Sequence, residues 1–300
     1  MNILVTGATG TVGEPLVRFL QRASSEHRFF FTARRPAIIR HKIDAKTWQI
    51  RQFDFEDIYS FKSALKEIDR LFLLRPPNLT DVKGYILPLL KAAKEAEVKL
   101  IVFLSIQSAD KNKWTPHYKI EKALKESGIN YIFLRSGFFM QNFLQEIRED
   151  ITKRDEVFVP AGSNRFSFID AEELAEVTAD LLLNAPEASQ IYTLTGTSPM
   201  DYYRVATVAS EALGRPIRYT NPNPFWFIFR KMMRGRSLMF AFIQVVLYRF
   251  NRVPPADQYR HTLQRLLNRP PKSLSAFFIE HQEELSAQKT IAPTTDKTRD

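Results

Sequence analysis

Short apolar runs bounded by turn residues alternate along this chain with segments whose apolar residues recur every three or four positions. The first pattern is typical of buried strands and the second of amphipathic helices. Seven strands are predicted, at residues 2–6, 28–32, 48–53, 70–74, 99–105, 131–134 and 190–194. Because strands that alternate with helices form parallel sheets covered on both faces, the pattern predicts a doubly wound α/β fold.

Helices are expected between these strands. Four are marked by apolar residues at helical spacing, which in chain order are Leu16, Val17 and Leu20, then Phe61 and Leu65, then Ile86, Leu89 and Leu90, and finally Ile120 and Leu124. After Ser136 the alternation loosens, and there we expect one helix capped by Asp170 with Glu173 and another from Met200 to Leu213. This weaker pattern predicts a second, smaller and mainly helical lobe.

The predicted organisation is a sheet domain over residues 1–150, completed by parts of 165–195, and then a C-terminal lobe over residues 151–285. The polar end, residues 286–300, has little to bury and is expected to be a disordered tail. With no cysteine and only five scattered histidines, the composition predicts neither thiolate chemistry nor a metal site. The first residues already form a strand without a basic leader, so we expect a cytoplasmic protein.

Three glycines follow the first strand directly, in the loop Gly7-Ala8-Thr9-Gly10-Thr11-Val12-Gly13 that opens the first helix. The first glycine allows a sharp turn off the strand, the second lets a pyrophosphate approach the backbone, and the third lets helix pack on strand. The helix N-terminus offers free N–H groups to phosphate oxygens. The place of the loop therefore predicts dinucleotide binding by Gly7, Thr9, Gly10, Thr11, Val12 and Gly13.

Two arginines, Arg34 and Arg35, stand at the end of the second strand, where an acidic residue would bind a ribose 2′-hydroxyl. A carboxylate repels a 2′-phosphate, whereas arginine pairs with it bidentately, so we expect NADP(H) to be preferred over NAD(H). The alternative is a solvated basic turn. Asp54, which follows the third strand beside Phe55, is placed either to accept from an adenine amino group or to hold a turn.

The Gly-x-x-Gly-x-x-Gly spacing resembles the short-chain dehydrogenase/reductase superfamily, and further stretches resemble its atypical NmrA-like branch. These stretches, spread over roughly residues 1–221, are Phe72–Pro77, Val102–Ser105, His117–Glu121, Leu134–Asn142, Pro160–Gly162, Ser167–Asp170 and Tyr192–Gly196. The resemblance implies a Rossmann domain that binds NADP(H) and a C-terminal lobe with a substrate pocket. It also implies that the cofactor is lined by Leu74, Arg75, Ser105, His117 and Phe138. The pocket would be shaped by Phe139, Met140 and Asn142, unless these side chains belong to the core.

Two assignments of the catalytic helix stay open. Enzymes of the superfamily pair a tyrosine proton donor with a lysine four residues later and a serine on the strand before, which here are Tyr118, Lys122 and Ser105. Relatives with a short helix ending such as Ser127-Gly128-Ile129 place the functional residue about eleven positions before the glycine, at His117. We favour His117, which would bond to the ribose or shuttle a proton near neutral pH. The third alternative is that neither set takes part, although Ser105 ends its strand at the edge where ligands bind.

The net charge of +10 is concentrated between Arg215 and Lys272, where twelve basic residues stand against Asp257 alone. Apolar and aromatic residues are interspersed with these charges, most densely over residues 223–250, in runs too short to span a membrane. We favour a substrate cap, because arginine stems commonly cover buried aromatics. Contact with a membrane surface and self-association through 223–250 are the alternatives. Without a nucleic-acid-binding motif, we expect no nucleic-acid partner.

The loop, the arginines and the resemblance together favour an NADP(H)-binding oxidoreductase that transfers hydride to a small apolar acceptor of the quinone, azo or enone type. NmrA-like proteins also include redox sensors, so a non-catalytic NADP(H)-sensing regulator is the alternative. A nucleotide-sugar epimerase-like enzyme is a weaker alternative, because its tyrosine–lysine pair would be out of register here. Turnover of NADPH distinguishes the oxidoreductase from the sensor.

Overall fold

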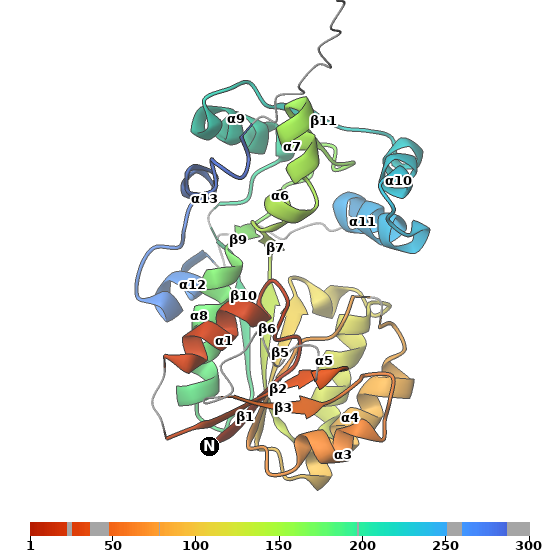
Figure 1. Cartoon of the computed structure of the whole chain (residues 1–300), viewed down its shortest axis with the longest axis vertical. Coiled ribbons are helices and arrows are strands. Elements are labelled where there is room, and N and C mark those ends of the chain that lie inside the picture. The colour runs from red at the N-terminus through yellow and green to blue at the C-terminus, as the bar shows by residue number, and fades with distance from the viewer. Residues whose placement is uncertain (23–25, 37–47, 78, 197, 251–259, 287–300) are drawn as a thin grey trace, which may run out of the picture. The chain divides into compact units, whose positions relative to one another are not determined.

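The computed structural model describes residues 1–22, 26–36, 48–77, 79–196, 198–250 and 260–286 (Figure 1). The chain forms two compact units. The sheet unit contains residues 1–139, 167–198 and 253–272, and the second unit contains residues 140–166, 199–252 and 273–300. The chain therefore returns to the sheet unit twice. The tail expected at 286–300 lies outside the described residues except for Ser286.

Seven parallel strands form the main sheet, in the order β10-β6-β5-β4-β1-β2-β3. Their bounds are β1 (Asn2–Val5), β2 (Arg28–Ala33), β3 (Trp48–Gln52), β4 (Arg70–Leu73), β5 (Leu100–Ile106), β6 (Asn130–Ser136) and β10 (Gln190–Leu194). The doubly wound parallel fold expected from the sequence is confirmed. Strand order reverses between β1 and β4, and at such a switch point the carboxyl ends of the strands open a crevice for ligands.

Alternate residues of each strand pack on opposite faces of the sheet. Ile3 and Val5 belong to one buried cluster, whereas Leu4 belongs to the other. The first face is covered by α1 (Gly13–Gln21), α8 (Ala171–Asn184) and α12 (Arg260–Leu267), and the second by α3 (Ser60–Leu65), α4 (Leu87–Glu95) and α5 (Pro116–Ser127). Because both faces are covered, central strands such as β1 and β5 are almost entirely apolar, which made them detectable as short apolar runs. The edge strand β3 instead alternates apolar and polar residues.

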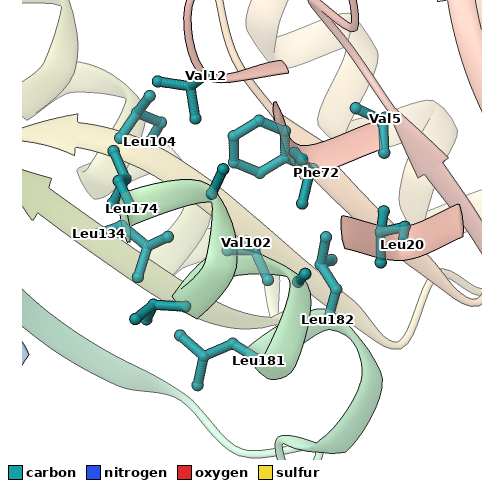
Figure 2. Close-up of a cluster of buried hydrophobic side chains, with 14 of the residues drawn as sticks. Val5, Val12, Leu20, Phe72, Val102, Leu104, Leu134, Leu174, Leu181 and Leu182 are labelled. Atoms are coloured by element: carbon teal, nitrogen blue, oxygen red, sulfur yellow. The ribbon is translucent and has the colours of Figure 1, made fainter. Parts of the chain in front are cut away.

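Leucines of α8 close the first face of the sheet (Figure 2). Leu174, Leu181 and Leu182 pack in one cluster with Val102 of β5 and Leu134 of β6. All five side chains are buried. Since burial of a leucine or valine contributes roughly 1.5–3 kcal/mol, the packing of α8 is a main source of stability for the sheet unit.

Helix starts follow capping residues in the sequence. Asp170 at α8 and Asp201 at α9 (Tyr202–Leu213) each accept a hydrogen bond from a backbone N–H of the first turn. The sequence pattern extended the second of these helices back to Met200, but the cap at Asp201 makes Tyr202 its first helical residue. A π-helical turn, η2 (Val82–Ile86), precedes α4, and a short 3₁₀ turn, η3 (Ala109–Lys111), precedes α5.

Two short parallel strand pairs lie outside the seven-stranded sheet, and the sequence pattern does not predict them. β7 (Phe138–Phe139) pairs with β9 (Phe168–Ile169) in the sheet unit, and β8 (Glu156–Phe158) pairs with β11 (Arg218–Thr220) in the second unit. Close backbone contact accompanies the first pair, since a Cβ on Gly137 would lie 2.5 Å from the carbonyl oxygen of Ser167. Strands of two or three residues carry too little periodicity to be detected in a sequence.

A buried carboxylate holds the helices of the second unit together. These helices are α6 (Asn142–Gln145), α7 (Arg148–Arg154), α9, α10 (Pro224–Met233), α11 (Leu238–Phe250) and α13 (Leu274–Glu280). Asp150 of α7, which is 1% exposed, accepts hydrogen bonds from Arg230 and Arg234. Arg230 also lies 2.7 Å from Glu156 of β8. The carboxylate thus connects α7 to the end of α10.

Other basic residues from 215–272 are also paired inside their own unit. The pairs are Arg215 with Asp155, Lys231 and Arg236 with Glu146, Arg269 with Glu173 and Glu176, and Lys272 with Asp170. Much of the positive charge that the sequence concentrates in this segment is therefore balanced by the protein's own acids.

The outer side of α10 and α11 is apolar. Side chains that are at least 38% exposed there are Phe225, Trp226, Phe229, Met232, Met233, Leu238, Met239, Phe242, Val246 and Leu247. Phe227 and Lys231 are the buried residues of α10. None of the helices in the described part of the chain is both long and apolar enough to cross a membrane.

We expect Asp150→Asn to lower the free energy of unfolding by about 3 kcal/mol, because Arg230 and Arg234 would lose the buried carboxylate that they share and keep only Glu156 and Glu149. Glu149→Gln is the matched control, since this neighbouring acid is 44% exposed and pairs with Arg234 and Lys153. The control should lose less than about 1 kcal/mol. Urea unfolding followed by circular dichroism measures both, and equal losses would contradict the role of the buried carboxylate.

Candidate functional site

The loop after β1 has contacts that admit only glycine at two positions. Gly7 has a φ of +68°, and a Cβ there would lie 2.8 Å from Cδ2 of Leu74. A Cβ on Gly13 would lie 2.0 Å from the carbonyl oxygen of Gly7, so α1 starts in direct backbone contact with the loop. Gly10 differs, because its nearest neighbour is the same carbonyl oxygen at 3.3 Å and the rest of the space beside it is open.

The start of α1 has the properties of a phosphate site. No side chain caps it, whereas α5, α8 and α9 each have a capping side chain. In this first turn the N–H of Glu14 already donates to the carbonyl oxygen of Gly10 at 2.9 Å and Pro15 has no N–H, which leaves those of Val12 and Gly13 for a ligand. The helix dipole adds a positive potential there. Thr9 is exposed, Gly10 and Thr11 are half-buried, and Val12 is buried in the core. The loop therefore fits a dinucleotide pyrophosphate.

Thr6 joins the exits of β1 and β4 across the switch point. Its hydroxyl donates to the carbonyl oxygen of Phe72 at 3.0 Å and accepts from the N–H of Leu74 at 2.7 Å. Thr6 itself is fully buried. Leu74 and Arg75 thus leave the sheet next to the glycine loop, at the crevice that such a switch point creates.

Arg75 is a largely buried cation without a carboxylate partner in the described structure. Its Nη1 donates to the carbonyl oxygens of Pro76, Pro77 and Leu79 at 2.6, 3.1 and 2.9 Å. Its Nε is buried and makes no hydrogen bond with the described residues. Burial lowers the pKa of the guanidinium to about 10, so Arg75 remains charged at neutral pH.

His117 lies in the first turn of α5, against β5, and the charge of Arg75 affects its pKa. Thr115 caps the helix by accepting from the N–H of Tyr118 at 3.2 Å. The His117 ring stacks on Phe103, with ring centroids 6.1 Å apart. Burial, followed by the positive charge of Arg75, lowers the pKa of His117 to about 3. The imidazole is therefore neutral near pH 7, whereas a proton shuttle requires a pKa near that pH, and the role of His117 toward a ligand stays a prediction.

Ser105 belongs to a buried ionic network between β5, β6 and α5. Its hydroxyl donates to Oε1 of Glu121 at 2.7 Å, and the two residues are 1% and 2% exposed. Glu121 also accepts from Arg135, at 3.0 Å from Nε and 2.6 Å from Nη2. Arg135 in turn lies 3.1 Å from Asp110. The serine proton is therefore engaged with Glu121, which leaves the lone pairs of the hydroxyl for a ligand.

Lys122 lies on the solvent side of α5. Its side chain is 61% exposed and its ammonium lies 3.7 Å from Glu126. Tyr118 is half-buried. A lysine lowers the pKa of a catalytic tyrosine by holding its charge next to the phenol, and an exposed ammonium beside a different residue is poorly arranged for that. Both assignments of the catalytic helix made from the sequence stay predictions.

The predicted adenosine-binding residues differ in their surroundings. Arg34 and Arg35 directly follow β2, are exposed, and form no ion pair with the described residues. Asp54 accepts from the backbone N–H two residues further on at 3.1 Å, which holds the turn after β3. Phe55 is buried and packs edge-on against Phe53, with ring centroids 4.8 Å apart. The arginines are thus accessible to a ligand, while Asp54 and Phe55 already have contacts of their own.

The predicted substrate loop is divided between the two units. Phe138 and Phe139 form β7 in the sheet unit, and both are half-buried. Met140 and Asn142 belong to the second unit. Met140 is fully buried there and Asn142 is the half-buried first residue of α6. Met140 therefore packs in the interior, which is the alternative that the sequence left open for this run.

Buried polar atoms without a hydrogen-bond partner lie near the carboxyl ends of the strands. Within the described residues of the sheet unit they include Nε of Arg75, Nε2 of Gln107, Oγ of Ser108 and Oγ1 of Thr195. Gln107 and Ser108 follow β5, Thr195 follows β10, and Arg75 comes two residues after β4. Such atoms are uncommon in proteins unless water or a ligand satisfies them. They make this edge of the sheet suited to a polar ligand.

Glu121 and Arg135 are site residues that the sequence pattern does not single out. A signal exists, because Glu121 interrupts the apolar stripe of Ile120 and Leu124, and Arg135 directly follows an apolar strand run. A charge at a buried position needs a buried partner. Which partner it has is decided by the packing of α5 on the sheet, which the sequence pattern alone does not give.

Comparison with known proteins finds relatives along most of the chain. The model of the NmrA-like family matches residues 1–253. The prestalk A differentiation protein A of Dictyostelium discoideum is 25% identical over 98% of this chain and 96% of its own length. The NAD(P)H azoreductase of Xenophilus azovorans is 31% identical over 72% of this chain and 76% of its own length. A solved NADPH-dependent quinone oxidoreductase from Escherichia coli, complexed with NADPH, has a TM-score of 0.81 at 24% identity, covering 93% of this chain and 99% of that one.

Acidification is expected to destabilise the protein through His117. Its folded-state pKa of about 3 lies below the ordinary value of 6.5. The unfolded chain therefore binds the proton first, and stability is lost as the pH falls below 6.5. Between pH 7 and pH 5 this single group accounts for about 2 kcal/mol.

His117→Asn should lack that part of the acid sensitivity, which urea unfolding at the two pH values measures. His261→Asn is the control, because His261 is exposed. The same pH dependence in both variants and in the unaltered protein would show that His117 is not held neutral.

Proposed function

The chain belongs to the NmrA-like family, and on that premise we propose that it binds NADPH at the carboxyl edge of its sheet and reduces a small, mainly apolar acceptor of the quinone, azo or enone type. The observation that carries the proposal is the start of α1, an uncapped helix whose Gly13 touches the backbone of Gly7. The relative named as an NAD(P)H azoreductase, 31% identical to this chain, supports the same class of reaction.

Each part of the cofactor has a candidate partner in the sheet unit. The N-terminus of α1 would take the pyrophosphate, Arg34 and Arg35 the 2′-phosphate, and His117 a ribose hydroxyl. The nicotinamide, when bound, supplies the hydride. His117 serves as a neutral hydrogen-bonding group, because burial and Arg75 keep its pKa far below 7.

The proposed preference for NADPH rests on Arg34 and Arg35. Both guanidiniums are exposed where β2 ends, and no carboxylate among the described residues pairs with either. A bidentate contact between arginine and a phosphate is a strong charge-assisted interaction. NADH lacks the 2′-phosphate and therefore cannot make this contact.

A second candidate function is a non-catalytic protein that senses NADP(H). The observation in its favour is the solvent-exposed Lys122, which leaves Tyr118 without the neighbouring ammonium used by the wider superfamily. Both candidate functions require NADPH binding, and they differ in turnover. An epimerase-like enzyme would need the tyrosine–lysine pair and is therefore the least supported.

NADPH oxidation in the presence of 1,4-naphthoquinone, an azo dye or an enone tests the proposed reaction. We expect turnover by the unaltered protein and none by Gly10→Asp, because a carboxylate in the open space beside Gly10 would repel the pyrophosphate. Gly10→Ala is the matched control, since its methyl group adds bulk without charge and should change the affinity by less than about tenfold.

Calorimetric titration with NADPH separates binding from turnover in these proteins. Binding without turnover on all three acceptors would favour the sensor. Unchanged affinity in a folded Gly10→Asp protein would contradict the assignment of the loop.

The double substitution Arg34→Ala with Arg35→Ala should weaken NADPH binding and leave NADH binding nearly unchanged. Each charged hydrogen bond that is lost is worth about 1.5–3 kcal/mol, or roughly tenfold or more in affinity. Calorimetry with the two cofactors makes the comparison within one protein. Equal losses for NADPH and NADH would show that these arginines do not bind the 2′-phosphate.

A further inference from the structure

Arg75 differs from the other arginines of the sheet unit that donate to backbone carbonyls. The negative charge of Glu67 acts on Arg51, and that of Glu187 acts on Arg70. None of the acidic side chains in the described residues acts on Arg75, and its Nε is buried without a partner among them. A desolvated cation without an anion destabilises the fold. The fold maintains this unbalanced charge at a place where ligands enter such sheets.

Arg75 lies near two parts of the candidate site, the glycine loop and His117. It follows Leu74, which packs against Gly7 of the glycine loop. Its charge also acts on His117 at the start of α5, where it contributes to the low pKa of that imidazole. Arg75 therefore lies at the crevice between the glycine loop and His117.

We propose that Arg75 binds a negatively charged oxygen of the hydride acceptor and so gives the protein a preference for acceptors that carry an acidic group, such as sulfonated naphthoquinones. The proposal rests on the function proposed above. The phosphates of the dinucleotide already have partners in the start of α1 and in Arg34 and Arg35. The unpaired Nε of Arg75, next to His117, is left for the second ligand.

A purely structural role for Arg75 explains only part of its contacts. Nη1 alone donates to the three carbonyl oxygens that shape the turn from Pro76 to Leu79. Nε and Nη2 make no hydrogen bond with the described residues. A guanidinium and a carboxylate or sulfonate form charge-assisted hydrogen bonds about twice as strong as neutral ones. Two donors on one edge of Arg75 suit such a group.

The test compares two ligands that differ by one sulfonate group, 1,4-naphthoquinone-2-sulfonate and 1,4-naphthoquinone. Their affinities are measured by calorimetry for the full chain saturated with NADP⁺, so that no turnover occurs. We expect Arg75→Gln to weaken sulfonate binding by about tenfold to a hundredfold, and to weaken binding of the neutral quinone and of NADP⁺ much less. Arg75→Lys, which keeps the charge, should retain much of the sulfonate affinity. Arg51→Gln is the matched control, because Arg51 also donates to backbone carbonyl oxygens but is a residue of β3.

Other outcomes have distinct meanings. Loss of NADP⁺ affinity in Arg75→Gln with both quinones unaffected would overturn the proposal and assign Arg75 to the dinucleotide phosphates. Lower stability without any change in affinity would leave only the structural role and overturn it as well. If Arg75→Gln does not fold, sulfate competition on the unaltered protein decides, since sulfate must displace the sulfonate but not 1,4-naphthoquinone. Binding of the sulfonate through Arg75 in a protein that reduces no acceptor would support the anion site and reject the proposed reaction.

Discussion

The close approach of α1 to the end of β1 is the constraint on which the candidate site depends. Because Gly13 touches the carbonyl oxygen of Gly7, no side chain separates the helix start from the strand exit. Thr6 then ties the exit of β4 to that of β1. These contacts bring an uncapped helix N-terminus, a cation and an imidazole to one edge of the sheet. A bulkier loop would move the helix start away from the switch point, and the other groups would no longer face a common ligand.

The central strands of the main sheet could be predicted because a strand covered on both faces is almost entirely apolar. The run from Leu100 to Leu104 in β5 is an example, with every side chain buried. The small β7–β9 pair could not be predicted from the sequence. Its position depends on the close approach of the Gly137 backbone to Ser167 rather than on any periodic pattern. Helix α12 presents a similar difficulty. Its buried Leu263 and Leu267 indicate a helix with an apolar face, but not that this face covers the main sheet.

Charge is the property for which the sequence was least informative, because ion pairs join positions far apart in the chain. Arg230 and Asp150 are 80 residues apart, so the basic segment looks unbalanced when its own composition is counted. In the folded units two buried acids, Asp150 and Glu121, each organise surrounding arginines. Removing such an acid would take away the most buried of the anions that balance these arginines. The arginines near these acids therefore serve the fold first, and the exposed Arg34 and Arg35 remain for ligands.

The neighbouring residues Arg75 and His117 show that the chemistry of a side chain follows from its surroundings. A histidine in a sequence suggests a group that titrates near neutral pH. Here burial and a nearby cation both oppose the imidazolium, so the ring stays neutral. An anion bound at Arg75 would offset the charge that Arg75 exerts on the imidazole and raise the pKa of His117. By linkage, protonation of His117 would favour the anion in return. The protonation of the site is thus coupled to the charge of the ligand it holds, and a histidine considered alone could not reveal this.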